Sequence, residues 1–270
     1  MTAEGVEQNY ILKDGVLQCV VPSLERYYQE EPSRILALFT ACAAQGCTIE
    51  VNTYAAALKS VPLLNRLPAS VLRESVQNLL LSDMPEALDP LIAAGALASY
   101  GIVNSISCLH ELQNVPCTME SRWWSFLRLC NANYRFVCER LGFSQRFAEA
   151  LVALDRLAAT RTLPQDVQEL KRLLSTLPEV DYESAAKTFL LHDERWQGQI
   201  ELFEQLRESR EPYLVRHLAV TPAELVAAGV SKEKVGRVVR GLLDAIIKAP
   251  AVNTQPALIA LAKTLEEQYR

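Results

Sequence analysis

The sequence lacks the patterns that mark metal proteins and most small-molecule enzymes. Its seven cysteines include no Cys-x-x-Cys pair, and the two nearest, Cys42 and Cys47, lie five residues apart. This spacing indicates neither a zinc site nor a disulfide framework, so we expect reduced thiols that pack as small apolar groups. The ten glycines do not cluster into a phosphate-binding loop. We therefore expect no metal, no cofactor and no catalytic residue set.

Long apolar runs and an excess of basic residues are missing too. No stretch approaches the roughly 20 apolar residues that span a bilayer, and residues 1–7 have no apolar segment of a signal peptide. We expect a cytoplasmic protein with no membrane partner. The net charge is −5, from 27 Lys and Arg against 32 Asp and Glu. Any RNA binding would thus require a local basic patch, because the whole surface is not basic.

What is present is helical periodicity. From residue 23 onward apolar residues recur every three or four positions, as in residues 33–44, which Gly46 would end with a left-handed cap. The strongest pattern predicts one helix over residues 121–141. Residues 8–22 contain the only plausible β-hairpin, with a turn at Asp14-Gly15. The sequence predicts an all-α fold with a short N-terminal β-hairpin.

The last third of the chain carries clear helix-start signals. Residues 221–224 read Thr-Pro-Ala-Glu, which is a capping box with proline at the first helical position. Ser231 is expected to cap a helix over residues 232–248, and Asn253 to open the last helix.

Two segments in this order resemble a known family. Residues 30–36 read Glu-Glu-Pro-Ser-Arg-Ile-Leu, with Gly46 and Ile49 following in register, and the second segment spans residues 220–236. They resemble the neck and tail signatures of bacterial CCA-adding enzymes, which are tRNA nucleotidyltransferases of the poly(A) polymerase family. The resemblance implies a helical neck, body and tail. The expected division is an N-terminal hairpin or remnant over 1–22, a neck over 23–100, a body over 101–195 and a tail over 196–270.

In that family, an Asp and an Arg of the neck motif select CTP or ATP. Here Glu31 falls on the Asp position and Arg34 is retained, so the resemblance makes Glu30, Glu31 and Arg34 the remnant of a nucleotide template. The next two family arginines are replaced by Ala37 and Thr40. The alternative is structural: acids favour a helix N-terminus, and Glu31 and Arg34 form an i,i+3 pair.

The motifs of the family's catalytic head do not occur before residue 30, where no Asp-x-Asp metal pair is found. Phosphoryl transfer needs such carboxylates. We therefore expect a non-catalytic, headless pseudoenzyme that binds tRNA or structured RNA, or that serves as a scaffold for another protein. The alternative is one subunit or fragment of a transferase whose nucleotidyltransferase head is a separate protein. That alternative predicts an exposed apolar patch near residues 8–40.

Four cations are the best candidates for contacts with RNA. Lys232, Lys234, Arg237 and Arg240 fall at the start of the tail helix, opposite its apolar face. Residues 211–270 hold eight Lys and Arg against six Asp and Glu, so the tail is mildly basic. The resemblance implies that this region contacts the tRNA elbow, whereas the plain alternative is a solvated helix face. Trp124 is expected on the surface, where it could stack on a base.

Overall fold

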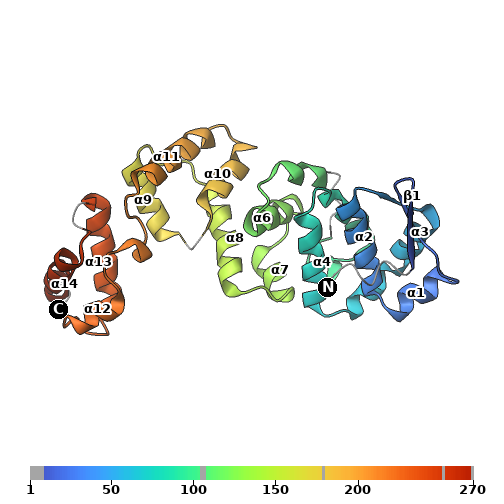
Figure 1. The fold of residues 1–270 in the computed structure, drawn as a ribbon, viewed down its shortest axis with the longest axis horizontal. Helices are drawn as coiled ribbons and strands as arrows, with labels where there is room; N and C mark the ends of the chain where they lie inside the picture. The colour runs from blue at the N-terminus through green and yellow to red at the C-terminus, as the bar shows by residue number, and fades with distance from the viewer. Residues whose placement is uncertain (1–8, 104–107, 178–179, 251–252, 269–270) are drawn as a thin grey trace. The chain divides into compact units, whose positions relative to one another are not determined.

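The computed structural model describes residues 9–103, 108–177, 180–250 and 253–268 (Figure 1). The chain divides into two compact units, one reaching to Ala159 and the other beginning at Thr160. Helices dominate both units, and among the described residues strands occur only near the start of the first, so the predicted all-α class with a short N-terminal hairpin is confirmed. The finer division into hairpin, neck, body and tail stays a prediction.

The hairpin consists of β1 (Tyr10–Lys13) and β2 (Val16–Cys19), which pair antiparallel from Tyr10↔Cys19 to Lys13↔Val16. Asp14 and Gly15 both have positive φ, 53° and 75°, as the tightest hairpin turns require. A third strand, β3 (Thr48–Ile49), pairs parallel with β2. Periodicity could not predict β3, because a two-residue strand has none and its partner lies some thirty residues away.

The first unit contains eight α-helices among its described residues. They are α1 (Leu24–Glu30), α2 (Ser33–Gln45), α3 (Val51–Ser60), α4 (Ala69–Leu80), α5 (Asp89–Ala93), α6 (Met119–Leu129), α7 (Tyr134–Arg140) and α8 (Gln145–Ala158). Short 3-10 helices lie between them, namely η2 (Val61–Arg66), η3 (Pro85–Leu88), η4 (Ala98–Tyr100) and η5 (Leu109–Asn114). Gly46 ends α2 with φ 59°, in the left-handed conformation that the sequence predicted.

The prediction of a single helix over residues 121–141 is wrong. The chain breaks between α6 and α7, where Asn131 adopts φ 50° and the Asn133 side chain accepts a hydrogen bond from the Phe136 N–H, capping α7. The apolar stripe continues across the break, so periodicity alone could not reveal it. The signal was Asn131-Ala-Asn133, because asparagine favours both left-handed residues and N-caps.

The second unit contains six α-helices among its described residues. They are α9 (Val167–Thr176), α10 (Tyr182–Leu190), α11 (Trp196–Ser209), α12 (Pro222–Ala227), α13 (Val235–Lys248) and α14 (Gln255–Gln268), with η6 (Val215–His217) after α11. The fully buried Lys171 of α9 forms an ion pair with Glu211, just beyond α11. This pair ties α9 to the end of α11.

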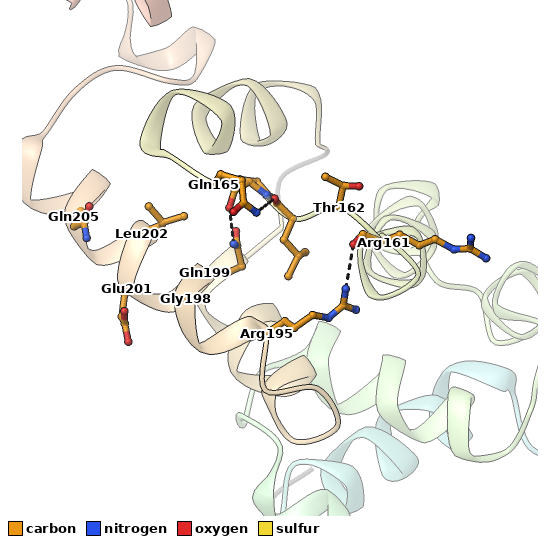
Figure 2. A pocket seen from close by; sticks show the side chains of 11 residues that line it. Arg161, Thr162, Gln165, Arg195, Gly198, Gln199, Glu201, Leu202 and Gln205 are labelled. Carbon is orange, nitrogen blue, oxygen red and sulfur yellow. Dashed lines mark hydrogen bonds between the residues drawn. The ribbon is translucent and has the colours of Figure 1, made fainter.

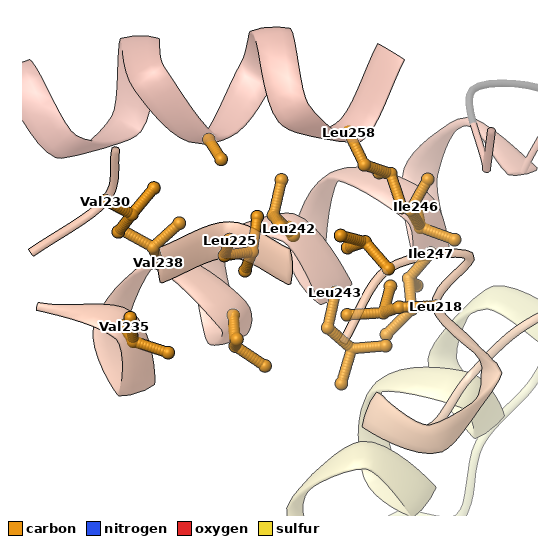
Figure 3. Packing of buried hydrophobic residues seen from close by; sticks show 13 residues of the cluster. Leu218, Leu225, Val230, Val235, Val238, Leu242, Leu243, Ile246, Ile247 and Leu258 are labelled. Atoms are coloured by element: carbon orange, nitrogen blue, oxygen red, sulfur yellow. The ribbon is translucent and has the colours of Figure 1, made fainter. Parts of the chain in front are cut away.

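The core of the last third of the chain is built around α13 (Figure 3). Val238, Leu242 and Ile246 follow one another at intervals of four and are fully buried against α12 and α14, where Leu258 lies at the facing surface. Burial of each such side chain contributes about 1.5–3 kcal/mol. This packing fixes which face of α13 is turned to solvent. No helix in the described part of the chain is both long and apolar enough to cross a bilayer.

Candidate nucleic-acid interface

The exposed side of α13 and the turn before it carry the four predicted cations. Arg237 and Arg240 lie on the helix and are exposed, and Lys232 is exposed in the preceding turn. Lys234 is half-buried and occupies the N-cap position of α13. The expectation that Ser231 caps a helix from residue 232 is wrong, because the helix begins only at Val235. The structure nevertheless brings all four cations to one end of one helix.

The turn that holds the lysines is anchored at both ends. The Ser231 carbonyl accepts hydrogen bonds from the Lys234 and Val235 N–H groups, at 3.0 and 3.1 Å. The Ser231 N–H in turn donates to Glu266 of α14 at 2.8 Å. The geometry of the turn is therefore set by backbone contacts and by α14. The two lysine side chains are not needed to hold it.

The capping box predicted at Thr221 is confirmed and orders α12 beside this turn. The Thr221 hydroxyl accepts from the Glu224 N–H, and the Glu224 carboxylate accepts from the Thr221 N–H at 2.7 Å. These hydrogen bonds from Thr221 lower the pKa of Glu224. Glu224 also accepts from Gln255 of α14 at 2.9 Å, so it links α12 to α14, and each of these helices packs against α13.

The electrostatics of this face favour an anion. Lys232, Lys234 and Arg240 form no side-chain hydrogen bond or ion pair with any residue that the structure describes. The N-terminus of α13 adds the partial positive charge of the helix dipole. Gly236, in the first turn, faces open space, where a Cβ would meet nothing within 4 Å. The exposed acids Glu233 and Asp244 interrupt the face, so the patch is local.

The second predicted set, Glu30, Glu31 and Arg34, lies where α1 ends and α2 begins, and its charges are engaged locally. Glu30 pairs with Arg26 at 2.8 Å, and Glu31 pairs with Arg34 at 3.0 Å. Arg34 also donates to the Tyr27 carbonyl at 2.9 Å and lies 4.1 Å over the Tyr27 ring. The i,i+3 pair of the structural alternative is present, but its other part is wrong, because the two acids lie at the C-terminal end of α1 and the first turn of α2 holds no acidic residue. Any role in reading a nucleotide stays a prediction.

The expectation of a surface Trp124 is wrong. Trp124 is 1% exposed and Trp123 is fully buried. Helix α6 is enclosed on all sides over residues 121–127. Trp124 lies off the apolar stripe of the helix, but that face is covered too: Arg122 is buried and donates to the Leu80 and Val115 carbonyls at 3.0 and 2.9 Å. A buried arginine of this kind has no signature in periodicity.

Sequence reasoning missed a pocket of about 490 Å³ in the second unit, between residues 161–165 and one face of α11 (Figure 2). Its polar lining includes Arg195, Gln165 and Gln199. Glutamines with no motif carry no sequence signal, so only the fold reveals this site. Over the described ranges, no three His, Cys, Asp or Glu side chains are grouped so as to hold a metal ion.

In fold, the chain is similar to the CCA-adding enzymes, a class of tRNA nucleotidyltransferases. One is the Bacillus stearothermophilus CCA-adding enzyme in complex with CTP, with a TM-score of 0.61 and 16% identity over 94% of this chain and 66% of that one. A second is a CCA-adding enzyme in complex with ATP, with a TM-score of 0.53 and 14% identity over 87% of this chain and 59% of that one. No family model matches the sequence, and neither does any curated protein.

These comparisons confirm the fold that the resemblance implied. The chain spans 66% and 59% of the lengths of the two enzymes that it matches. At these identities the likeness concerns the fold alone, so activity, substrate and partners are matters of proposal.

Proposed function

We propose that this chain is a non-catalytic, cytoplasmic scaffold that binds tRNA or another structured RNA through the basic face of α13. The observation that carries the proposal is the state of the cations: Lys232, Lys234 and Arg240 have no partner among the described residues and lie on a face that packing turns outward. Exposed cations without partners are the groups that neutralise phosphates.

Two further points support an RNA partner over a protein partner. The fold is similar to that of CCA-adding enzymes, a class of tRNA nucleotidyltransferases, which favours an RNA ligand over a protein ligand. The chain is acidic overall, yet Lys232, Lys234 and Arg240 gather near one helix start, where Ser231 and Glu266 already hold the turn.

Filter binding with tRNA at two salt concentrations tests this proposal. If four phosphates are neutralised, affinity falls with a log–log slope of about −3.6, or roughly 100-fold between about 50 and 200 mM salt. A measurable affinity at about 50 mM salt that weakens in this way is expected. No affinity at the lower salt concentration contradicts the RNA scaffold and favours a protein-interaction role.

The alternative function, one subunit of a transferase with a separate catalytic head, has an observation of its own. Ile11 and Leu12 of β1 are 52% and 49% exposed, and Val20 after β2 is 46% exposed. Within the described residues β1 pairs only with β2, so it is an edge strand with exposed apolar groups on both faces. Such an edge suits docking of another chain.

Co-purification with a nucleotidyltransferase head protein, followed by an assay of CCA addition, separates the two functions. The subunit hypothesis expects Ile11→Lys with Leu12→Lys to abolish both association and activity. Val215→Lys, at a 43% exposed apolar residue of the second unit, is the matched control. Activity that does not depend on adding this chain contradicts the subunit role.

A further inference from the structure

The pocket of the second unit is built from one face of α11 and the segment that precedes α9 (Figure 2). Arg195, at the N-cap of α11, is followed three, four and seven residues later by Gly198, Gln199 and Leu202 of the helix, a spacing that places them on one helix face. At about 490 Å³, the pocket lies within the usual range for small-ligand sites, about 300–1,000 Å³.

Arg195 is held in a fixed orientation at the pocket wall. Its Nε and one terminal nitrogen donate to the Asp193 carboxylate at 3.0 and 2.7 Å, and the other terminal nitrogen donates to the Arg161 carbonyl at 3.0 Å. These hydrogen bonds lie in the guanidinium plane because its N–H groups do. They leave the flat faces of the guanidinium for stacking, and Asp193 offsets its charge.

Gln199 offers a fixed amide. Its side chain is buried, its Oε1 accepts from the Tyr182 hydroxyl at 3.0 Å, and its Nε2 donates to the Pro164 carbonyl at 2.8 Å. These two contacts set which end is oxygen and which is nitrogen, and each end keeps one further hydrogen-bonding position. Gln165 is held in a similar way by its donation to the Leu163 carbonyl at 2.7 Å.

Gly198 keeps the space beside these groups open. It lies inside a helix, where glycine costs about 1 kcal/mol relative to alanine, and a Cβ there would meet nothing within 4 Å. Its backbone is not in the left-handed region, so the helix itself does not require glycine at this position.

The charge of the pocket argues for a neutral ligand. Arg195 is compensated by Asp193, and the lining also includes Glu201 and Arg161, which carry opposite charges. A phosphate would therefore meet little net positive charge here. The pocket combines a flat guanidinium face for stacking, fixed amides and free volume. These features suit a planar group with donors and acceptors along its edge.

We propose that this pocket binds a nucleobase, which would stack on the Arg195 guanidinium and pair its edge with the amides of Gln199 and Gln165. Glutamine amides and guanidinium planes recognise bases in this way. The base could belong to a free nucleoside or to an unstacked nucleotide of RNA. The second source rests on the function proposed above, whereas the first does not.

Titration of the ¹⁵N-labelled chain with each of the four ribonucleosides tests the pocket directly. At least one nucleoside is expected to change the NMR chemical shifts of the Gln199 side-chain amide and the Gly198 backbone amide. These changes should saturate with a dissociation constant of about 1 mM. Gly198→Leu places a side chain in the pocket and should weaken this binding at least tenfold. Because leucine is a better helix former than glycine, the melting temperature should not fall.

Glu204→Leu is the matched control, since it adds the same side chain to α11 at an exposed position outside the pocket lining. It should leave nucleoside binding unchanged. Gly198→Ala, which adds one methyl group, guards against a fold defect in the leucine variant.

Two RNAs separate this proposal from the RNA scaffold itself. Gly198→Leu should lower affinity about tenfold for RNA with an unpaired end, within the range of one lost base-stacking contact, and leave fully paired RNA unaffected. Nucleoside binding without RNA binding would support the pocket and refute the scaffold. RNA binding without any nucleoside shift, or a pocket that takes only peptides, overturns the nucleobase proposal and leaves the scaffold standing.

Discussion

Two charged segments, one in each unit, differ in how their charges are used. Around residues 30–34 every charged side chain has a partner: Glu30 has Arg26, and Glu31 and Arg34 have each other. At the start of α13, Lys232, Lys234 and Arg240 have none within the described part of the chain. In the sequence, each segment had both a functional and a structural interpretation. The structure distinguishes charges that stabilise the fold from charges that can meet a ligand.

The difference has a local cause. Residues 30–34 join two helices that pack closely, so a guanidinium there can reach a backbone carbonyl and an aromatic ring. The turn before α13 is closed by the Ser231 carbonyl and by Glu266, and it needs no side chain from its lysines. A charge is available for binding where the backbone already satisfies the turn.

The largest expected effect concerns a third charge, Lys171, which is fully buried and paired with Glu211. Lys171→Ala removes the pair and leaves a cavity between α9 and α11, so we expect a loss of about 3 kcal/mol in the free energy of unfolding of the second unit. Chemical denaturation measures it. Lys187→Ala, at a half-exposed pair with Glu183, is the control and should change stability little. Equal losses in the two variants would argue against the distinction between buried and exposed pairs.

A smaller effect is expected at Arg34. Arg34→Gln removes the hydrogen bond to Tyr27, the ion pair with Glu31 and the contact with the Tyr27 ring, which together should lower stability by about 1–2 kcal/mol. Its affinity for tRNA should match that of the unaltered chain. A weakened affinity without a loss of stability would show that residues 30–34 contact RNA. The proposed difference between this segment and the start of α13 would then be wrong.

The smallest effect is expected at Asp89 of the first unit. In contrast to Lys171 and Arg34, this charge has no ion-pair partner among the described residues. Its buried Oδ1 accepts no hydrogen bond from the described residues, and burial, with a lesser effect of Glu86, raises its pKa to about 6. A raised pKa means that the ionised carboxylate is less stable in the folded chain than in the unfolded one. The loss of folding stability from the ionised carboxylate is therefore present above pH 6. It disappears as the pH falls toward the ordinary pKa of an aspartate.

Asp89→Asn should accordingly be more stable than the unaltered chain by about 1 kcal/mol at pH 7, with the gain shrinking toward pH 4. The expected gain is smaller than the free energy that corresponds to the full pKa shift, because the Asp89 side chain is partly exposed. Melting temperatures of both proteins across this pH range provide the measurement. A gain that is constant with pH would mean that ionisation is not its cause.

Local signals predicted much of this fold. The Asp14-Gly15 turn, the Gly46 cap and the Thr221 capping box each depend on a few adjacent residues, and each occurs as expected. The failures involve contacts between distant segments. Strand β3 exists only through its pairing with β2, and Trp124 is buried because α6 is covered on every side.

The candidate sites follow the same division. Helical periodicity placed Arg237 and Arg240 opposite the apolar face of α13, and the structure has them exposed. Spacing also offered the i,i+3 pair of Glu31 and Arg34, but it could not show the pair of Lys171 with Glu211, because these two residues lie 40 positions apart. The pocket at Gln199 depends on Tyr182 and Pro164, which lie 17 and 35 residues away, so no pattern in the sequence points to it.

The measurement that tests the central claim most directly is the salt dependence of tRNA binding for two variants. One changes Lys232, Lys234, Arg237 and Arg240 to Gln, and the other changes Glu30, Glu31 and Arg34 to Gln. The first variant is expected to lose up to about 3.6 of the log–log salt slope, so that its affinity no longer falls roughly 100-fold between about 50 and 200 mM salt, whereas the second keeps the full slope. Equal slopes for the two variants would contradict the central claim.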